Sequence, residues 1–181
     1  MESEIAHGKL RLINTRKLMI EPRSRKKKNA TYDTSDIQRA LEFFLFAHLN
    51  LAADADAGLR SLGFHRTHHR ILYLVAVNPG TSVGDLVSTL RLTPQAVQSP
   101  MRQLNEKGYI QQRYSSTDRR KRCLFITSKG QTLVARLSSH QHRRIAKAFN
   151  LAGLAAVRGF LTVMEGMLTE DDRYFVERSS V

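Results

Sequence analysis

The stretch Ser82-Val83-Gly84-Asp85-Leu86-Val87-Ser88-Thr89-Leu90, with the turn and helix that follow it, decides the fold of this chain. Its residues Val83, Leu86, Val87 and Leu90 have the i, i+3, i+4, i+7 spacing of one helix face. After a short gap, Thr93 supplies an N-cap hydroxyl and Pro94 stands at the first helical position, where its missing N–H costs nothing. Two short helices joined by a tight turn predict a helix-turn-helix.

The second helix has one apolar face and one polar face. Val97, Met101 and Leu104 form the apolar face, and Gly108 is predicted to end the helix. A polar face on such a helix fits the major groove of a duplex. We predict that base edges are addressed by Gln95, Gln98 and Ser99, and guanine or phosphate by Arg102. The full set of residues predicted to face DNA is Thr93, Gln95, Ala96, Gln98, Ser99 and Arg102.

Pro100 lies inside this second helix. It removes the hydrogen bond to the carbonyl of Ala96 and is expected to kink the helix axis. The sequence therefore leaves open the directions in which Gln103 and Asn105 point.

Residues 109–114 and 122–127 are predicted to be two strands, joined by the basic segment 115–121. The order of helix, polar helix and basic-tipped hairpin resembles the MarR family of bacterial transcription regulators. The wing pattern of that family, an Asp, any residue and an Arg before an apolar strand that ends in Thr, is matched here by Asp118-Arg119-Arg120 and Leu124-Phe125-Ile126-Thr127. The resemblance covers roughly residues 36–168 and implies a winged helix-turn-helix.

The resemblance also implies how the wing binds. It places Arg120 in the minor groove, with Asp118 holding its guanidinium group. Arg119 and Lys121 are then expected to contact phosphates. The alternative is that this cluster is only an exposed charged turn.

Composition favours a globular nucleic-acid-binding protein. The chain has 181 residues and a formal net charge of +13, from 29 Lys and Arg against 16 Asp and Glu. Such a charge attracts polyanions, of which double-stranded DNA and membrane surfaces are the two candidates. No run of about 18 apolar residues and no apolar signal-peptide core is present, so we expect no membrane partner. The single cysteine, Cys123, fits a reducing compartment, and we expect a cytoplasmic protein.

The predicted fold is mainly α with a small β-wing: a winged helix-turn-helix flanked by N- and C-terminal helices. Helices are predicted over residues 36–62 and 65–77 before it, and from Ser128 or Lys129 to about 150 and over 151–168 after it. The segments are a basic extension (1–34), an N-terminal dimerisation helix (35–62), the DNA-binding domain (63–130), C-terminal dimerisation helices (131–168) and a polar tail (169–181). The extension has nine basic and four acidic residues and is either a solvated tail or an arm that lies along DNA.

The resemblance further implies a homodimer that releases DNA when a small aromatic or phenolic acid binds between the dimerisation helices and the DNA-binding domain. In this chain the candidate ligand pocket consists of His48, His65, Arg66, His68, His69, Arg70 and Tyr73, whose groups can pair with a carboxylate or a phenol. A basic, partly exposed start of a helix is the competing interpretation.

Metal and thiol chemistry have less support. His140 and His142 are two residues apart and point to different sides of a helix, so we expect no metal site and no cofactor. Cys123 next to Arg122 is either an activated wing thiol or a packed, inert one, and packing is the favoured interpretation.

The sequence bears on three classes of function. An enzyme is not expected, because the sequence has no Gly-rich phosphate loop, no paired cysteines and no credible catalytic triad. The predicted function is a dimeric, sequence-specific DNA-binding regulator that reads a pseudo-palindromic operator and acts as a repressor. The alternative is a non-sequence-specific or architectural DNA-binding protein, which would show little preference among sequences.

Overall fold

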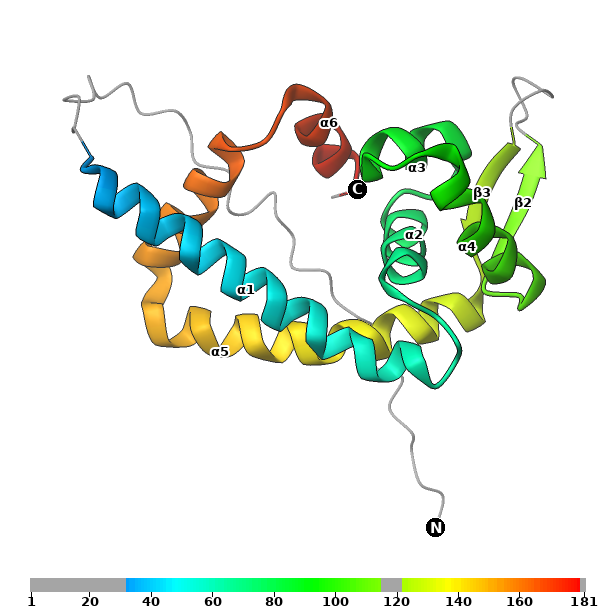
Figure 1. The fold of residues 1–181 in the computed structure, drawn as a ribbon, viewed down its shortest axis with the longest axis horizontal. Coiled ribbons are helices and arrows are strands. Elements are labelled where there is room, and N and C mark those ends of the chain that lie inside the picture. Colours follow the sequence, from blue (N-terminus) through cyan, green and yellow to red (C-terminus); the bar gives the residue numbers. More distant parts are fainter. Residues whose placement is uncertain (1–31, 115–121, 180–181) are drawn as a thin grey trace, which may run out of the picture.

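The computed structural model describes residues 32–114 and 122–179 (Figure 1). The fold is mostly helical with one small antiparallel sheet, and this confirms the predicted fold class. Its elements are, in chain order, α1 (Thr34–Arg60), α2 (Arg66–Val77), β1 (Thr81–Ser82), α3 (Val83–Leu90), α4 (Pro94–Glu106), β2 (Ile110–Tyr114), β3 (Arg122–Ile126), α5 (Ser128–Gly166) and α6 (Glu170–Ser179).

The helix-turn-helix and the hairpin form as predicted, and α2 packs with them into one domain. We call residues 66–114 and 122–127 the winged-helix domain. Its sheet has the order β1-β3-β2, with Gln112 opposite Leu124 in the hairpin. The strand β1 was not predicted, because two residues carry no periodicity. Thr81 and Ser82 become a strand only by pairing with Leu124 and Cys123 of β3.

The core consists of fully buried aliphatic side chains from α2, α3, α4 and the hairpin of this domain, together with Leu59 from the end of α1. Burial of each such side chain contributes roughly 1.5–3 kcal/mol. The set includes Leu59, Ile71, Leu72, Leu86, Leu104, Ile110 and Leu124. Because one face of α4 belongs to this core, its opposite face is fixed toward solvent.

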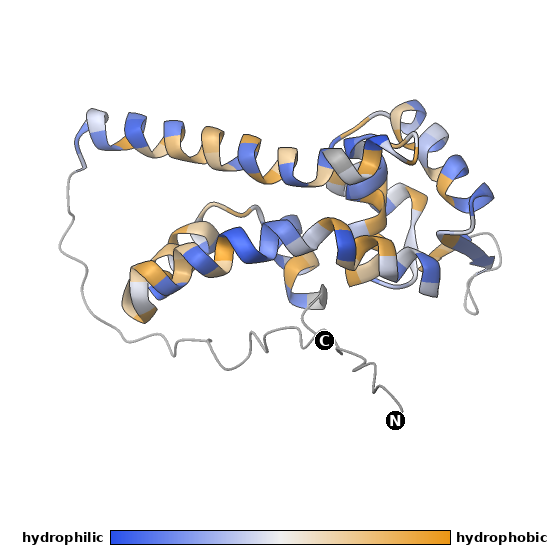
Figure 2. Cartoon of the chain, turned by 90° about the horizontal axis from the view of Figure 1, so that it is seen from below, coloured by the Kyte–Doolittle hydropathy of each residue, from blue (hydrophilic) through white to orange (hydrophobic). Residues whose placement is uncertain are grey.

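The first helix and α5 run side by side and form an arm that extends from the winged-helix domain (Figure 1). Arg144 Nε lies 2.8 Å from Asp54 Oδ2, and Gln141 Nε2 donates to the carbonyl of Leu51 at 2.7 Å. The first helix starts at Thr34 with Asp33 as its N-cap, not at the capping signal expected from residues 34–36. Viewed from below, the first half of α1 stands apart from α5 (Figure 2).

The two predicted C-terminal helices meet at a different residue from the one expected. The helix α5 extends from Ser128 to Gly166 and is interrupted at Gly153, where φ is 79° and ψ is 163°. The predicted division was at residues 150–151. A residue with a side chain adopts this backbone conformation only with strain, so the bend falls at glycine.

The C-terminal segment 169–181, expected as a polar tail, contains the helix α6. Thr169 caps it, because the Asp172 amide donates to Thr169 Oγ1 at 3.2 Å and that hydroxyl donates to Asp172 Oδ2 at 2.8 Å. Arg91 Nη2, in the turn between α3 and α4, lies 2.6 Å from Asp172 Oδ2. The helix α6 was not predicted, because its sequence is too polar to show an apolar stripe.

Candidate nucleic-acid interface

The N-terminus of α4 is built by the capping group that the sequence indicated. Thr93 Oγ1 accepts a hydrogen bond from the amide of Ala96 at 3.3 Å, and Pro94 begins the helix. Val97, Pro100, Met101 and Leu104 are buried and hold one face of α4 against the core. All six residues predicted to face DNA are exposed on the helix or at its cap: Thr93, Gln95, Ala96, Gln98, Ser99 and Arg102.

Pro100 does not interrupt α4, which continues to Glu106. Its ring is buried on the core side of the helix. The two directions that the sequence left open are now defined: Asn105 is exposed, whereas Gln103 is half-buried and points inward. Gln103 Oε1 lies 3.2 Å from Nε2 of the fully buried His68 on α2.

The helix α3 supports α4 through its own cap and turn. Ser82 Oγ accepts from the Asp85 amide at 3.1 Å, and Asp85 Oδ2 accepts from the Ser82 amide at 2.9 Å. At its C-terminus Arg91 has a positive φ of 52°, which lets the chain turn into α4. Hydrogen bonding to Thr169 and the nearby Arg91 guanidinium hold the pKa of Asp172 below its usual value.

Two arginines stand at the base of the wing. Arg113 lies over the ring of Phe125, 5.3 Å from its centroid, and Arg122 lies over Tyr114 at 5.6 Å. Both side chains are exposed. Neither arginine was predicted as a DNA contact, although two arginines that flank a basic loop are a recognisable signal. The predicted wing-tip residues Asp118, Arg119, Arg120 and Lys121 lie outside the described residues.

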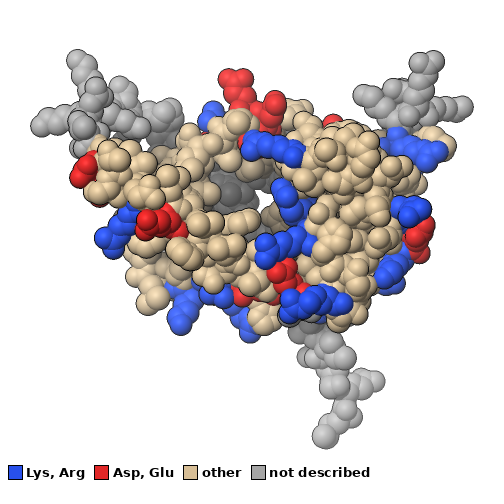
Figure 3. All heavy atoms as spheres, viewed as in Figure 1, with Lys and Arg blue, Asp and Glu red and all other residues tan. Residues whose placement is uncertain are grey.

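Basic side chains are concentrated around the winged-helix domain (Figure 3). On the face shown in Figure 3, Lys and Arg side chains gather over the half of the molecule that holds the winged-helix domain. Arg102 lies 3.9 Å from Glu106 Oε1, and both side chains are well exposed. Such an exposed pair is weak and leaves the guanidinium available to a phosphate or a base.

The residues predicted to line a ligand pocket are distributed over several environments. His65 caps α2, and its amide lies 3.2 Å from His68 Nδ1. His68 stacks on Phe64 with centroids 4.5 Å apart, which makes it a packed core residue. The exposed Arg66 pairs with Asp56 at 3.0 Å. A pocket of about 370 Å³ next to this pair is lined by Asp56, Leu59, Arg60, Phe64, His65 and Arg66.

The other candidates do not line that pocket. Arg70 Nη2 donates to the carbonyl of Leu90 at 3.4 Å, and His48 and Tyr73 are exposed on α1 and α2. His69 Nε2 is buried and, in the part of the chain that the structure describes, has no hydrogen-bond partner. Burial lowers the pKa of both His68 and His69, so both rings are neutral near pH 7.

Acidic groups near this region are held in ion pairs. A hydrogen bond from Arg66 lowers the pKa of Asp56, and one from Arg144 lowers that of Asp54.

Within residues 32–114 and 122–179, no group of three His, Cys, Asp or Glu side chains is placed to hold a metal ion. Cys123 is half-buried on β3. None of the described helices is long and apolar enough to span a membrane.

Comparison with known proteins agrees with this geometry. A model of the MarR family matches residues 62–121. The HTH-type transcriptional regulator PetP of Rhodobacter capsulatus is 34% identical over 132 residues, which are 73% of this chain and 80% of PetP. A MarR family regulator from Silicibacter pomeroyi superposes with a TM-score of 0.64 at 16% identity, over 76% of this chain and 94% of that one.

A further solved structure, the MarR family protein RV2887 of Mycobacterium tuberculosis in complex with salicylic acid, has a TM-score of 0.51 at 22% identity and covers 71% of this chain and 96% of its own. The family match and the similarity to PetP identify a DNA-binding transcription regulator. The chain belongs to the MarR family.

Proposed function

We propose that this MarR family regulator acts as a homodimer that binds a pseudo-palindromic operator in a sequence-specific manner. The observation that carries the proposal is the face of α4, where six polar or small residues are exposed while four buried residues fix the helix. Two such helices, related by a two-fold axis, read half-sites about 34–36 Å apart.

The dimer is supported by apolar surface on the arm. Ile37, Leu41, Leu45 and Phe46 of α1 are exposed, and the side chain of Leu41 retains 57% of its accessibility. Beyond Gly153, the exposed residues include Leu154, Phe160, Val163 and Met167. Apolar residues recur along both of these segments in Figure 2. A monomer rarely leaves so many large apolar side chains in water, so we expect a second copy of the chain to cover them.

Individual DNA contacts follow from residue chemistry. Gln95 and Gln98 have amides that can bond an adenine edge, and Arg102 has a guanidinium that can bond guanine or phosphate. We assign the minor-groove contact to Arg120 of the wing, oriented by Asp118, and phosphate contacts to Arg119 and Lys121.

We further propose that the protein is a repressor released by a small aromatic or phenolic acid. RV2887, which shares the fold, was solved with salicylic acid. In this chain His65 and Arg66, two of the seven predicted ligand residues, line the pocket of about 370 Å³. Because Arg66 already pairs with Asp56, a ligand carboxylate would compete with Asp56 for its guanidinium.

The test is an anisotropy titration of the full chain on DNA from the region upstream of its own gene, at physiological salt and with random duplex as competitor. We expect nanomolar binding that survives the competitor, with one dimer per site. Weak binding with the same affinity for the upstream DNA and for the random duplex would favour the charge-driven, non-specific alternative.

Three variants separate the proposed contacts. Arg120→Ala should weaken binding to every operator variant, whereas Gln98→Ala should relax the preference at one position in each half-site, a change of about 1–3 kcal/mol. Lys147→Ala removes an exposed charge on α5 and is the control, with little expected effect. Equal effects of all three on every sequence would contradict the assigned roles.

A further inference from the structure

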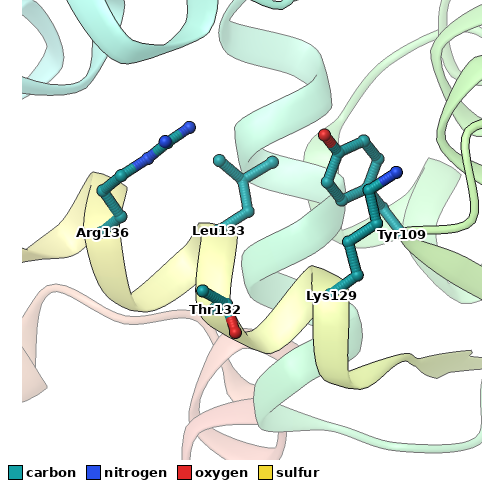
Figure 4. A pocket seen from close by; sticks show the side chains of 5 residues that line it. All are labelled: Tyr109, Lys129, Thr132, Leu133 and Arg136. Atoms are coloured by element: carbon teal, nitrogen blue, oxygen red, sulfur yellow. The ribbon is translucent and has the colours of Figure 1, made fainter.

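A second pocket lies where α5 begins, and none of the seven predicted ligand residues lines it. Its volume is about 350 Å³, which is within the range of small-molecule sites. Its lining consists of Tyr109, Lys129, Thr132, Leu133 and Arg136 (Figure 4). Lys129, Leu133 and Arg136 follow the i, i+4, i+7 spacing of one helix face, and Figure 4 shows them rising from α5 on the same side as the ring of Tyr109.

The lining has cations at both ends and an apolar centre. Lys129 and Arg136 are seven residues apart, roughly 10 Å along the helix axis, and Leu133 lies between them. Thr132 turns its hydroxyl away to donate to the carbonyl of Ser128 at 3.0 Å. No carboxylate lines this pocket, and among the described residues Arg136 has no acidic partner.

Lys129 also joins this pocket to the recognition helix. Its Nζ donates to the carbonyl of Lys107, the C-cap residue of α4, at 2.8 Å and lies 4.5 Å from the centroid of the Tyr109 ring. A cation at this end of a helix satisfies a carbonyl that has no intrahelical donor and stabilises the helix dipole. Lys107 in turn donates through its own Nζ to the carbonyl of Leu62 at 2.9 Å.

We propose that this pocket is a binding site for a small dicarboxylate, in which one carboxylate binds Arg136 and the other binds Lys129. Carboxylates form stronger hydrogen bonds with an ammonium group than a peptide carbonyl does. The ligand therefore draws Lys129 from the end of α4, and its binding lowers the affinity of α4 for DNA. This last step rests on the proposed function, whereas the binding step does not.

Binding is measured first on the DNA-free full chain, by calorimetric titration with succinate and glutarate, and with butyrate as the monocarboxylate comparison. We expect saturable binding of at least one dicarboxylate and at least about tenfold weaker binding of butyrate, because butyrate can satisfy only one cation. Arg136→Gln should weaken dicarboxylate binding about tenfold or more. The control Arg158→Gln removes an exposed arginine farther along α5 and should leave binding unchanged.

The site is overturned if neither dicarboxylate binds, or if Arg158→Gln weakens binding as much as Arg136→Gln. The coupling to DNA is tested with an operator fragment, whose affinity should fall about fivefold or more at saturating dicarboxylate in the wild type but not in Arg136→Gln. Lys129→Met should bind the operator more weakly without ligand, and unchanged affinity of a folded Lys129→Met protein would overturn the coupling. Dicarboxylate binding by a protein that has no preferred DNA sequence would sustain the site and contradict the proposed function.

Discussion

His68 connects the packing of the core to the recognition helix through a single side chain. It is fully buried, stacks on Phe64 and reaches Gln103 of α4 through Nε2. The His65 ring lies 4.2 Å from it, centroid to centroid. Because burial, together with the charge of His65, lowers the pKa of His68, the neutral ring is the form that the fold selects.

This predicts that the protein loses stability in mild acid. Unfolded histidine has a pKa of 6.5, so below that pH the unfolded chain takes up protons that folded His68 and His69 resist. The free energy of unfolding should therefore be lower at about pH 5.5 than at about pH 7.5, a window well above the titration of the paired aspartates. Chemical denaturation at the two pH values measures the difference.

His68→Gln should reduce this pH dependence, because one of the two titrating groups is gone. His142→Gln, which replaces an exposed histidine on α5, is the control and should keep the wild-type difference. If the two variants keep the same difference between the two pH values, His68 is not a source of the pH dependence.

Gly130 is required for a close approach of two backbones. A Cβ at this position would overlap the carbonyl oxygen of Tyr109 and contact Ile126 Cγ1 at 2.7 Å. Gly130→Ala should destabilise the protein by roughly 1–3 kcal/mol, because one of the two segments must shift. Gly84→Ala, where the new Cβ would lie 3.6 Å from Ser82 Oγ, should be neutral or stabilise α3 by up to about 1 kcal/mol. Thermal unfolding of the two variants provides the comparison, and equal loss in both would contradict the role of the close approach.

Side chains define both ends of α3. Its capping box joins Ser82 and Asp85, and its C-terminal turn is held by Arg91 and the ion pair to α6. The helix has eight residues, which is too short to be stable alone, so caps and burial of Leu86 and Leu90 must sustain it. The orientation of α4 depends on this short helix.

Removing the cap should therefore be measurable. Ser82→Ala loses the acceptor for the Asp85 amide and should lower the free energy of unfolding by about 0.5–2 kcal/mol. Ser88→Ala replaces an exposed serine within the same helix and should change stability by less than about 0.5 kcal/mol. Urea denaturation of both proteins checks the difference, and similar midpoints for the two would show that the capping box contributes little.

At the scale of the whole molecule, the distribution of apolar surface separates two parts. The winged-helix domain buries its aliphatic residues, whereas the outer half of α1 and the end of α5 leave theirs in solvent. Hydrophobic residues make up 41% of the chain. Those in the winged-helix domain form a closed core, whereas those on the outer arm remain exposed to solvent. In the proposed homodimer, the partner covers the exposed surface on the arm.

Leu45→Lys tests this surface. Placing a charge where an exposed leucine would be buried in a dimer should raise the dimer dissociation constant at least about tenfold and weaken operator binding in parallel. Gln131→Lys adds the same charge at an exposed polar position on α5 and should leave both unchanged. Sedimentation equilibrium measures the first effect. If the Leu45→Lys protein remained dimeric like the control, this surface of α1 would not be part of the dimer interface.

The sequence by itself determined the elements that depend on local chemistry. Thr93 with Pro94 defined the start of α4, and the spacing of Val83, Leu86 and Leu90 defined α3. Two runs of strand-forming residues on either side of the basic segment 115–121 indicated β2 and β3. Caps, periodicity and turns act over a few residues, so they can be read from neighbours in the chain. The exposed face of α4 followed from the same periodicity.

Only the tertiary structure decided the features that join distant residues. The inward turn of Gln103 to His68, the strand β1, the pairing of Arg91 with Asp172 and the pocket between Tyr109 and Arg136 each bring together side chains or backbones from separate elements. The bend of α5 also fell at Gly153 and not at the predicted boundary. Such contacts depend on how elements pack, and a periodic pattern carries no information about which residues from different elements will meet.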